Sequence, residues 1–165
     1  MSDAGLLRAK PLIEQLRQTT DELRHVRDQF GPIYVYYFPQ GWLKWLVFML
    51  GLTGKRDFAR HLSELQDLRS EAWRLVERAR ALFEELATCD IEQQMKIVFR
   101  LNYEQTYYDG NVIILMHNYV KSMHERNADD SMRSMRMMRE FGAKSRANEV
   151  LLRRATAQLV ATRDL

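Results

Sequence analysis

Apolar residues recur at spacings of three, four and seven positions along most of the chain, and this period is typical of amphipathic helices. The first such stretch predicts a helix from Pro11 to about Gln29, because proline is favoured in the first turn of a helix. Gly31-Pro32 is predicted to end it, since proline removes a hydrogen-bond donor and restricts the residue before it. The predicted apolar face consists of Leu12, Leu16, Thr19, Leu23, Val26 and Phe30.

Three longer helices are predicted over residues 56–87, 91–125 and 132–162. At about 1.5 Å per residue, each of them is about 50 Å long. Their apolar faces take about three positions in every seven, which is typical of a multi-helix bundle and wider than a two-stranded coiled-coil seam. Equal lengths joined by short turns favour antiparallel neighbours.

Local signals set the ends of these helices. Asp90, followed by Gln93, has the pattern of a capping box, and residues 129–131 are predicted to cap the last helix. Residues 108–111 with four apolar residues after them resemble a hairpin turn followed by a strand. The heptad spacing nevertheless continues across Gly110, so a single helix is predicted there, at a cost of about 1 kcal/mol for the glycine.

The segment from Gly31 to Lys55 departs from this helical pattern. Residues 33–38 are short and rich in aromatic side chains, so a strand or an extended loop is predicted. Residues 42–50 have the length of a helix but are apolar almost all round, with Lys44 as their only charge. Because residues 39–41 and Lys44 interrupt the run, it is too short to predict a membrane-spanning helix.

Three environments fit this aromatic segment: the core of the bundle, a membrane interface, or the surface of a protein partner. Tryptophan and tyrosine suit an interface because their rings are apolar while their polar atoms still reach water. The residues predicted to meet a partner or a membrane are Tyr34, Tyr36, Tyr37, Phe38, Trp42, Trp45, Phe48 and Met49.

A second candidate surface lies in the basic C-terminal helix. Residues 131–163 contain eight basic residues and two acidic ones, and a basic amphipathic helix can bind an acidic partner, anionic lipid or nucleic acid. The alternative is a bundle helix whose methionines fill the core and whose arginines pair with acids of the predicted helices at 11–29 and 56–87. The candidate basic Met-rich face consists of Met132, Arg133, Met135, Arg136, Met138 and Arg139.

Composition adds few constraints. A length of 165 residues suits one domain over residues 1–165, and 25 basic residues nearly balance 22 acidic ones, so no strong overall field demands a polyanionic partner. The only cysteine, Cys89, cannot form an intramolecular disulfide and is expected to be a partly buried residue between helices. The N-terminus lacks the apolar core of a signal peptide, so a cytoplasmic location, or the cytoplasmic face of a membrane, is expected.

Catalytic and metal-binding patterns are weak. The chain has no Glu-x-x-His pair of the kind that binds metal inside helical bundles. Asp109, His117 and His124 share one helix face, but about 10–12 Å separates successive members, so the three cannot converge on one ion. Neither a nucleophile elbow nor a binding motif for a small-molecule substrate or cofactor is recognised, and no cofactor is expected.

These observations favour an all-α fold: an elongated antiparallel bundle of three long helices plus an N-terminal helix, with a short aromatic insertion. The expected function is that of a non-enzymatic interaction protein, a subunit or adaptor of a larger assembly, either in the cytoplasm or peripheral to a membrane. Its partner would be another protein or a second copy of the chain. Membrane insertion and nucleic-acid binding through the basic helix are the alternatives.

Overall fold

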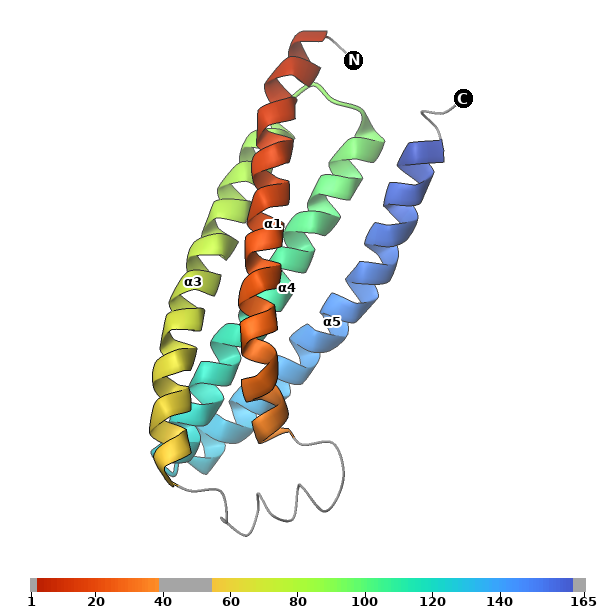
Figure 1. Cartoon of the computed structure of the whole chain (residues 1–165). Helices are drawn as coiled ribbons and strands as arrows, with labels where there is room; N and C mark the ends of the chain where they lie inside the picture. Colours follow the sequence, from red (N-terminus) through yellow and green to blue (C-terminus); the bar gives the residue numbers. More distant parts are fainter. Residues whose placement is uncertain (1–2, 39–54, 162–165) are drawn as a thin grey trace.

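The computed structural model describes residues 3–38 and 55–161, which form four long α-helices and no strand. These are α1 (Asp3–Tyr37), α3 (Lys55–Ala87), α4 (Gln93–His124) and α5 (Ala128–Ala161). Figure 1 shows an elongated bundle in which α1 and α4 run in one direction and α3 and α5 in the other. The predicted all-α antiparallel bundle is confirmed for this part of the chain.

The first helix is longer than predicted at both ends. It begins eight residues before Pro11 and continues through Gly31-Pro32 to Tyr37. A proline inside a helix removes one hydrogen bond, and its ring clashes with the Cβ of the residue before it. Gly31 has no Cβ, so the Pro32 ring does not clash with the side chain of the residue before it. The prediction that Gly31-Pro32 ends the helix was therefore wrong.

Residues 33–37 are helical, so the predicted strand or extended loop at 33–38 was also wrong. Phe30, Ile33 and Tyr37 follow one another at helical spacing, and each is at most 6% exposed. The backbone N–H of Phe38 still donates to the carbonyl oxygen of Tyr34, at 2.9 Å. Burial of three large side chains outweighs the cost of one proline and the high strand propensity of the aromatic run.

The predictions for the two middle helices are confirmed. α3 and α4 lie within two residues of their predicted bounds, and α4 is continuous across Gly110. Gly110 is buried, and a Cβ atom at this position would collide with Cγ2 of Val76 on α3. The glycine is thus a place where two helices approach closely, not a turn.

Two of the predicted caps were wrong. α4 has Glu92 at its N-cap in place of the predicted Asp90, and Glu92 makes no side-chain cap hydrogen bond. α5 begins at Ala128, four residues before Met132. Asn127 provides its cap, since Oδ1 of Asn127 accepts a hydrogen bond from the backbone N–H of Asp130 at 3.2 Å.

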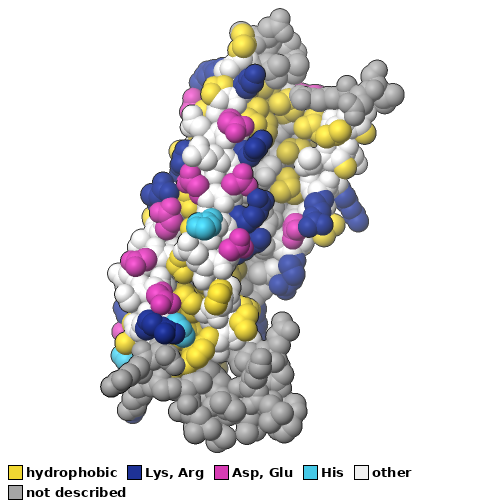
Figure 2. Space-filling view, in the orientation of Figure 1, with side chains coloured by type: hydrophobic (Ala, Val, Ile, Leu, Met, Phe, Trp, Pro, Cys, Tyr) yellow, Lys and Arg dark blue, Asp and Glu magenta, His cyan; other side chains and the backbone are white. Residues whose placement is uncertain are grey.

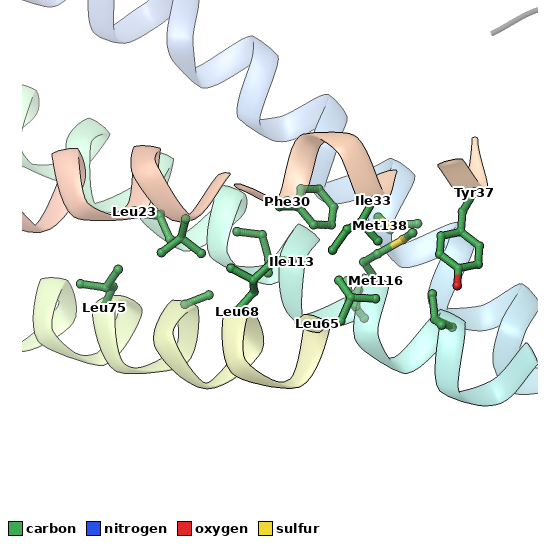
Figure 3. Close-up of a cluster of buried hydrophobic side chains, with 14 residues drawn as sticks. Leu23, Phe30, Ile33, Tyr37, Leu65, Leu68, Leu75, Ile113, Met116 and Met138 are labelled. Atoms are coloured by element: carbon green, nitrogen blue, oxygen red, sulfur yellow. The ribbon is translucent and has the colours of Figure 1, made fainter. Parts of the chain in front are cut away.

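The buried apolar side chains form two clusters, one toward each end of the bundle. The larger one lies near the C-terminal end of α1, where side chains of α1, α3 and α4 interdigitate and α5 contributes Met138 (Figure 3). It contains Leu23, Val26, Phe30, Ile33, Tyr37, Leu65, Leu68, Ala72, Leu75, Ile113, Leu115, Met116, Val120 and Met138. The smaller one contains Ala9, Leu12, Leu16, Ala79, Leu82, Leu86, Cys89, Ile91, Met95 and Phe99, which confirms the expected burial of Cys89.

α5 is attached differently from the other helices. It packs along α4, whereas α1 packs on α3 and α4, and α1 and α5 do not pack against each other along their length. The buried residues of α5 are Ser134, Met138 and Asn148, so two of the three are polar. α5 therefore lies at the side of the three-helix core (Figure 1).

None of the four described helices combines the length and the apolar character that a membrane-spanning helix needs.

Candidate functional site

A groove runs between α1 and α5, with α4 as its floor. It consists of two adjoining hollows of about 340 and 450 Å³, which share Arg27 and Asp109. A third hollow of about 670 Å³, lined in the described structure by α5 residues alone, adjoins them at Leu152 and Arg153 and continues the groove along α5. We call this feature the α1–α5 groove. Its α5 wall contains Met138, Arg139, Gly142, Ser145, Arg146, Glu149, Leu152, Arg153, Thr156, Ala157, Val160 and Ala161.

The α5 wall of the groove is one continuous helix face. Its residues recur at spacings of three and four from Met138 to Ala161, which is a length of about 35 Å. Figure 2 shows yellow apolar side chains in the hollow between the two sides of the molecule and dark-blue basic ones along its edges. In the described structure, no fifth helix covers this face.

Asp109 is the polar centre of the groove. Its Oδ1 accepts a hydrogen bond from Oγ of Ser145 at 2.6 Å, and its Oδ2 accepts one from Nε2 of Gln105 at 3.1 Å. Nη1 of Arg27 on α1 lies 3.4 Å from the same Oδ2. The Asp109 side chain is 15% exposed, so one partly buried carboxylate links α1, α4 and α5.

Asn148 extends this network toward the smaller core cluster. Its Nδ2 donates to the backbone carbonyl oxygen of Leu101 at 2.8 Å and to Oε1 of Gln105 at 3.1 Å. Asn148 is 4% exposed, so these bonds satisfy a buried amide. The junction of α4 and α5 therefore depends on directional hydrogen bonds as well as on apolar contact.

The groove carries more positive than negative charge. Five arginines line it, together with the two carboxylates Asp109 and Glu149. Three of the arginines pair with a carboxylate: Arg24 with Asp21, Arg27 with Asp109, and Arg153 with Glu149. Arg139 and Arg146 have no carboxylate partner among residues 3–38 and 55–161, so the positive charge of this wall is uncompensated.

The predicted methionine face of α5 is divided between core and solvent. Met138 is 4% exposed and joins the larger apolar cluster. Met132 is 57% exposed, and Met135 is half-buried. The three methionines therefore do not form one continuous surface. Met138 is a core residue that also lines the groove, and Met132 is exposed to solvent.

The arginines of α5 do not pair with acids of α1 or α3 in the described structure, so this part of the alternative was wrong, whereas Met138 does fill the core as that alternative supposes. The ion pairs of α5 are internal: Lys144 with Glu140 at 2.7 Å, and Arg153 with Glu149 at 2.6 Å. α5 does not pack along α3, so its arginines lie too far from the acids of α3 to pair with them. It faces α1 across the groove. The basic residues of α5 without a carboxylate partner in the described part of the chain are Arg133, Arg136, Arg139, Arg146 and Arg154.

The predicted aromatic surface is partly a core feature. Tyr37 is 3% exposed, and its ring lies edge-on to those of Phe58 and His61. Tyr36 is half-buried with its ring centroid 4.6 Å from that of His61. For Tyr36 and Tyr37 the structure thus supports packing within the bundle.

Tyr34 and Phe38 lie on the side of α1 that reaches the groove and α4. Tyr34 is 38% exposed and lines the smallest hollow of the groove. Phe38 stacks on Tyr119 of α4 at 5.4 Å between ring centroids, and burial raises the pKa of the Tyr119 phenol. The other predicted members of the aromatic surface lie outside the described residues: Trp42, Trp45, Phe48 and Met49.

The three residues considered for metal binding lie in different surroundings. Asp109 is part of the groove network, His117 is 3% exposed, and His124 is exposed at the end of α4. Burial lowers the pKa of His117, which favours its neutral form. No group of three or more potential metal ligands converges within the described ranges.

Several groove residues were missed by the sequence reasoning. Asp109 was considered only within a turn motif and as one of three candidate metal ligands, and Arg27, Ser145 and Arg146 were not singled out. A signal was available for Asp109, because a carboxylate on the apolar face of a predicted buried helix needs a partner. No comparable signal identifies its partners, since their meeting depends on the placement of α5 beside α1 and α4.

Comparisons with protein-family models, with curated proteins and with solved structures found no match to this chain.

Proposed function

We propose that the chain is a non-enzymatic helical interaction protein, a subunit or adaptor of a larger assembly, whose α1–α5 groove holds an acidic amphipathic helix of a protein partner. The observation that carries the proposal is the face of α5 from Arg139 to Ala161, which no other described helix covers. It lies beside a groove in which Arg139 and Arg146 have no carboxylate partner among the described residues. Amphipathic helices commonly bind by laying their apolar face in such a groove.

The shape of the groove supports a helical occupant. Its α5 wall is about 35 Å long, enough for about six turns of a partner helix. Apolar and aromatic side chains of all three helices line it, among them Tyr34 of α1, Val112 of α4 and Leu152 of α5. Val160 is 55% exposed at its open end, so a docked helix would remove apolar surface from water there.

Charge supports an acidic occupant. Arg139 and Arg146 stand on the α5 wall without a carboxylate partner in the described structure, and Arg154 is exposed on the same helix. Carboxylates on a partner helix would compensate these charges, and long-range attraction would raise the association rate. A basic partner would be repelled.

The alternative partners are an anionic membrane surface, a nucleic acid and a second copy of the chain. A membrane or a nucleic acid would use the arginines but would leave the concave, partly apolar shape of the groove unexplained. A second copy would bring an equally basic α5 face to the groove. The experiment below separates these alternatives by the identity of the crosslinked product.

Photo-crosslinking tests the proposal directly. p-Benzoylphenylalanine at position 160 lies at the end of the groove, and the same residue at position 73 is the control, because Trp73 is 57% exposed on α3 and lines none of its hollows. Both proteins would be irradiated in the cells that produce them naturally, and the crosslinked peptide identified by mass spectrometry. We expect position 160 to capture a helical segment rich in Asp and Glu.

Charge reversal of two groove arginines tests the role of charge, and the same reversal of two arginines on α3 is the matched control. Arg139→Glu with Arg146→Glu should reduce the yield from position 160 about tenfold, which corresponds to about 1.4 kcal/mol. Arg69→Glu with Arg80→Glu makes the same charge change on α3 and should leave the yield unchanged. A lipid, nucleic-acid or self-adduct at position 160, or equal yields from both double variants, would contradict the proposal.

A further inference from the structure

The smallest hollow of the α1–α5 groove, of about 340 Å³, has an unusual balance of charge. Three arginines line it: Arg27 from α1, and Arg139 and Arg146 from α5. Among the residues that the structure describes, Asp109 is the only carboxylate in its lining. The volume is within the range of small-ligand sites, which begins at about 300 Å³.

Asp109 cannot satisfy all three arginines. Its two oxygens already accept hydrogen bonds from Ser145, Gln105 and Arg27, which leaves about one of roughly four acceptor positions. Each guanidinium carries five N–H donors, so the donors of Arg139 and Arg146 greatly outnumber the protein acceptors of this hollow. The hollow therefore offers donors and positive charge to a ligand.

Gly142 makes room for this arrangement. It lies three residues after Arg139 and four before Arg146, so the three positions share one face of α5. A Cβ atom on Gly142 would stand 3.7 Å from Nη1 of Arg146, and no other atom outside its own helix turn lies within 4 Å. The Arg146 guanidinium thus lies over the glycine, and the space beside it is open.

We propose that the hollow bounded by Arg27, Arg139 and Arg146 is a binding site for a dianionic phosphate group. Such a group carries three strong acceptor oxygens and a charge of about −1.5 to −2 at neutral pH, which matches two uncompensated guanidinium groups. Arginine forks bind phosphate through pairs of parallel hydrogen bonds. The floor and the α1 wall add Phe30, Tyr34 and Val112, so the group attached to the phosphate meets an apolar surface.

This inference goes beyond the proposed helix docking and stands without it. A single carboxylate would compensate one of the two charges, whereas one phosphate monoester compensates both. The phosphate can belong to a small phosphate ester or to a phosphorylated side chain of a partner. The first experiments test whether the hollow binds phosphate, and a later experiment tests which kind of molecule carries the phosphate.

The test is a titration of the full chain, labelled with ¹⁵N, with inorganic phosphate at pH 7.5 and constant ionic strength maintained with sodium chloride. The backbone amide of Gly142 reports on the hollow, and its resonance is assigned with Gly142→Ala. We expect this resonance to shift saturably with phosphate and not with chloride alone. Absence of a phosphate-specific shift would overturn the proposal.

Two double variants separate a site from general attraction to a basic helix. Arg139→Gln with Arg146→Gln should weaken phosphate binding at least tenfold. Arg133→Gln with Arg136→Gln removes the same charge from exposed positions of α5 outside the hollow and should change binding less than twofold. Equal effects of the two double variants would overturn the proposal, because binding would then follow net charge alone.

Gly142→Leu tests the shape of the site without changing its charge. The leucine would fill the space beside Arg146, so phosphate binding measured by isothermal titration calorimetry should fall at least tenfold while the helical circular dichroism remains. Unchanged affinity would place the phosphate elsewhere and overturn the proposal.

Two further ligands then assign the source of the phosphate. Glycerol phosphate represents a free small ester, and an acidic peptide containing O-phosphoserine represents a phosphorylated partner. Binding of the peptide at least tenfold more tightly than glycerol phosphate supports a phosphorylated partner segment at this site. Equal or weaker binding of the peptide supports a free phosphate ester. If neither ligand competes with inorganic phosphate, the proposal fails, whereas the helix-docking proposal is judged by its own crosslinking result.

Discussion

Ser145 of α5 donates a 2.6 Å hydrogen bond to Oδ1 of Asp109 on α4, and this contact joins the helix at the side of the bundle to its core. The same carboxylate accepts hydrogen bonds from Gln105 and Arg27. Because Asp109 is only 15% exposed, water cannot fully replace the lost partners when its carboxylate is removed. The network therefore fixes both the position of α5 and the width of the groove.

We expect Asp109→Ala to lower the free energy of unfolding by about 1–3 kcal/mol, since it leaves the donors of Ser145 and Gln105 without their acceptor. Urea unfolding followed by circular dichroism measures this change. Combined with Ser145→Ala, the double-mutant cycle should show coupling of about 0.5 kcal/mol or more. Additive effects, or a loss of under about 0.5 kcal/mol for Asp109→Ala, would contradict the assigned role of this network.

The attachment of α5 predicts uneven stability along the chain. Among the described residues, α5 adds one buried apolar side chain, Met138, to the two clusters, and Phe141 and Leu159 pack against their edges, whereas α3 supplies several buried side chains to each cluster. Helices with few buried apolar contacts open at lower free energy than the core. Native-state hydrogen exchange should therefore show lower opening free energies for amides of α5 beyond Asn148 than for those in the middle of α3. Equal values for the two helices would show that α5 unfolds only with the whole bundle.

Substitution of alanine for Gly110 and for Gly142 should change the free energy of unfolding in opposite directions. Gly110→Ala places a Cβ atom against Val76, and overpacking of this kind costs about 1–3 kcal/mol, more than the gain in helix propensity. Gly142→Ala meets only ordinary contact with Arg146 and should stabilise the chain by about 0.5–1 kcal/mol. Chemical unfolding of both variants checks the pair. Stabilisation by Gly110→Ala would mean that α3 and α4 are farther apart than described.

Val76→Ala offers a second check on the same contact. If the collision with Val76 explains the cost of Gly110→Ala, the double variant should lose less stability than the sum of the two single variants. Additive losses would assign the cost to another cause.

His117 predicts a dependence of stability on pH. Burial lowers the pKa of the folded His117 below its unfolded value of about 6.5, while its hydrogen bond with Asn118 opposes this shift and nearby Arg69 and Lys121 add to it. As pH falls below about 6.5, the unfolded chain gains a proton that the folded chain does not yet bind, so the free energy of unfolding decreases. The decrease ends once pH reaches the folded pKa.

The difference in unfolding free energy between pH 7.5 and pH 5.5 measures this effect. His117→Gln should reduce that difference, whereas His124→Gln, which changes an exposed histidine, should not. A pH dependence that is the same in the wild type and in His117→Gln would show that His117 is not responsible for it.

The helical repeat predicted most of the fold. The extents of α3 and α4 and the continuity across Gly110 follow from apolar spacing, which reflects burial directly. The errors come from local signals. Gly31-Pro32 and the aromatic run after it indicate a break, but the core contacts of Phe30, Ile33 and Tyr37 outweigh both.

The candidate site was much harder to predict. The basic character of the last helix is visible in the sequence, and Arg139, which was named as part of a basic Met-rich face, lines the groove. The groove itself results from the absence of packing between α1 and α5, which no local pattern encodes. Likewise, Asp109, Ser145 and Arg27 are far apart in sequence and meet only through the tertiary arrangement.

The central claim is that the α1–α5 groove binds an acidic amphipathic helix, and fluorescence anisotropy with a labelled peptide tests it most directly. The probe is a helical peptide of about 24 residues with Glu on one face and Leu on the other, and the controls are its Lys-for-Glu counterpart and a scrambled acidic peptide. We predict saturable binding of the acidic amphipathic peptide, reduced about tenfold by Arg139→Glu with Arg146→Glu and unaffected by Arg69→Glu with Arg80→Glu. Equal affinity for the scrambled peptide, or equal losses in both double variants, would contradict the claim.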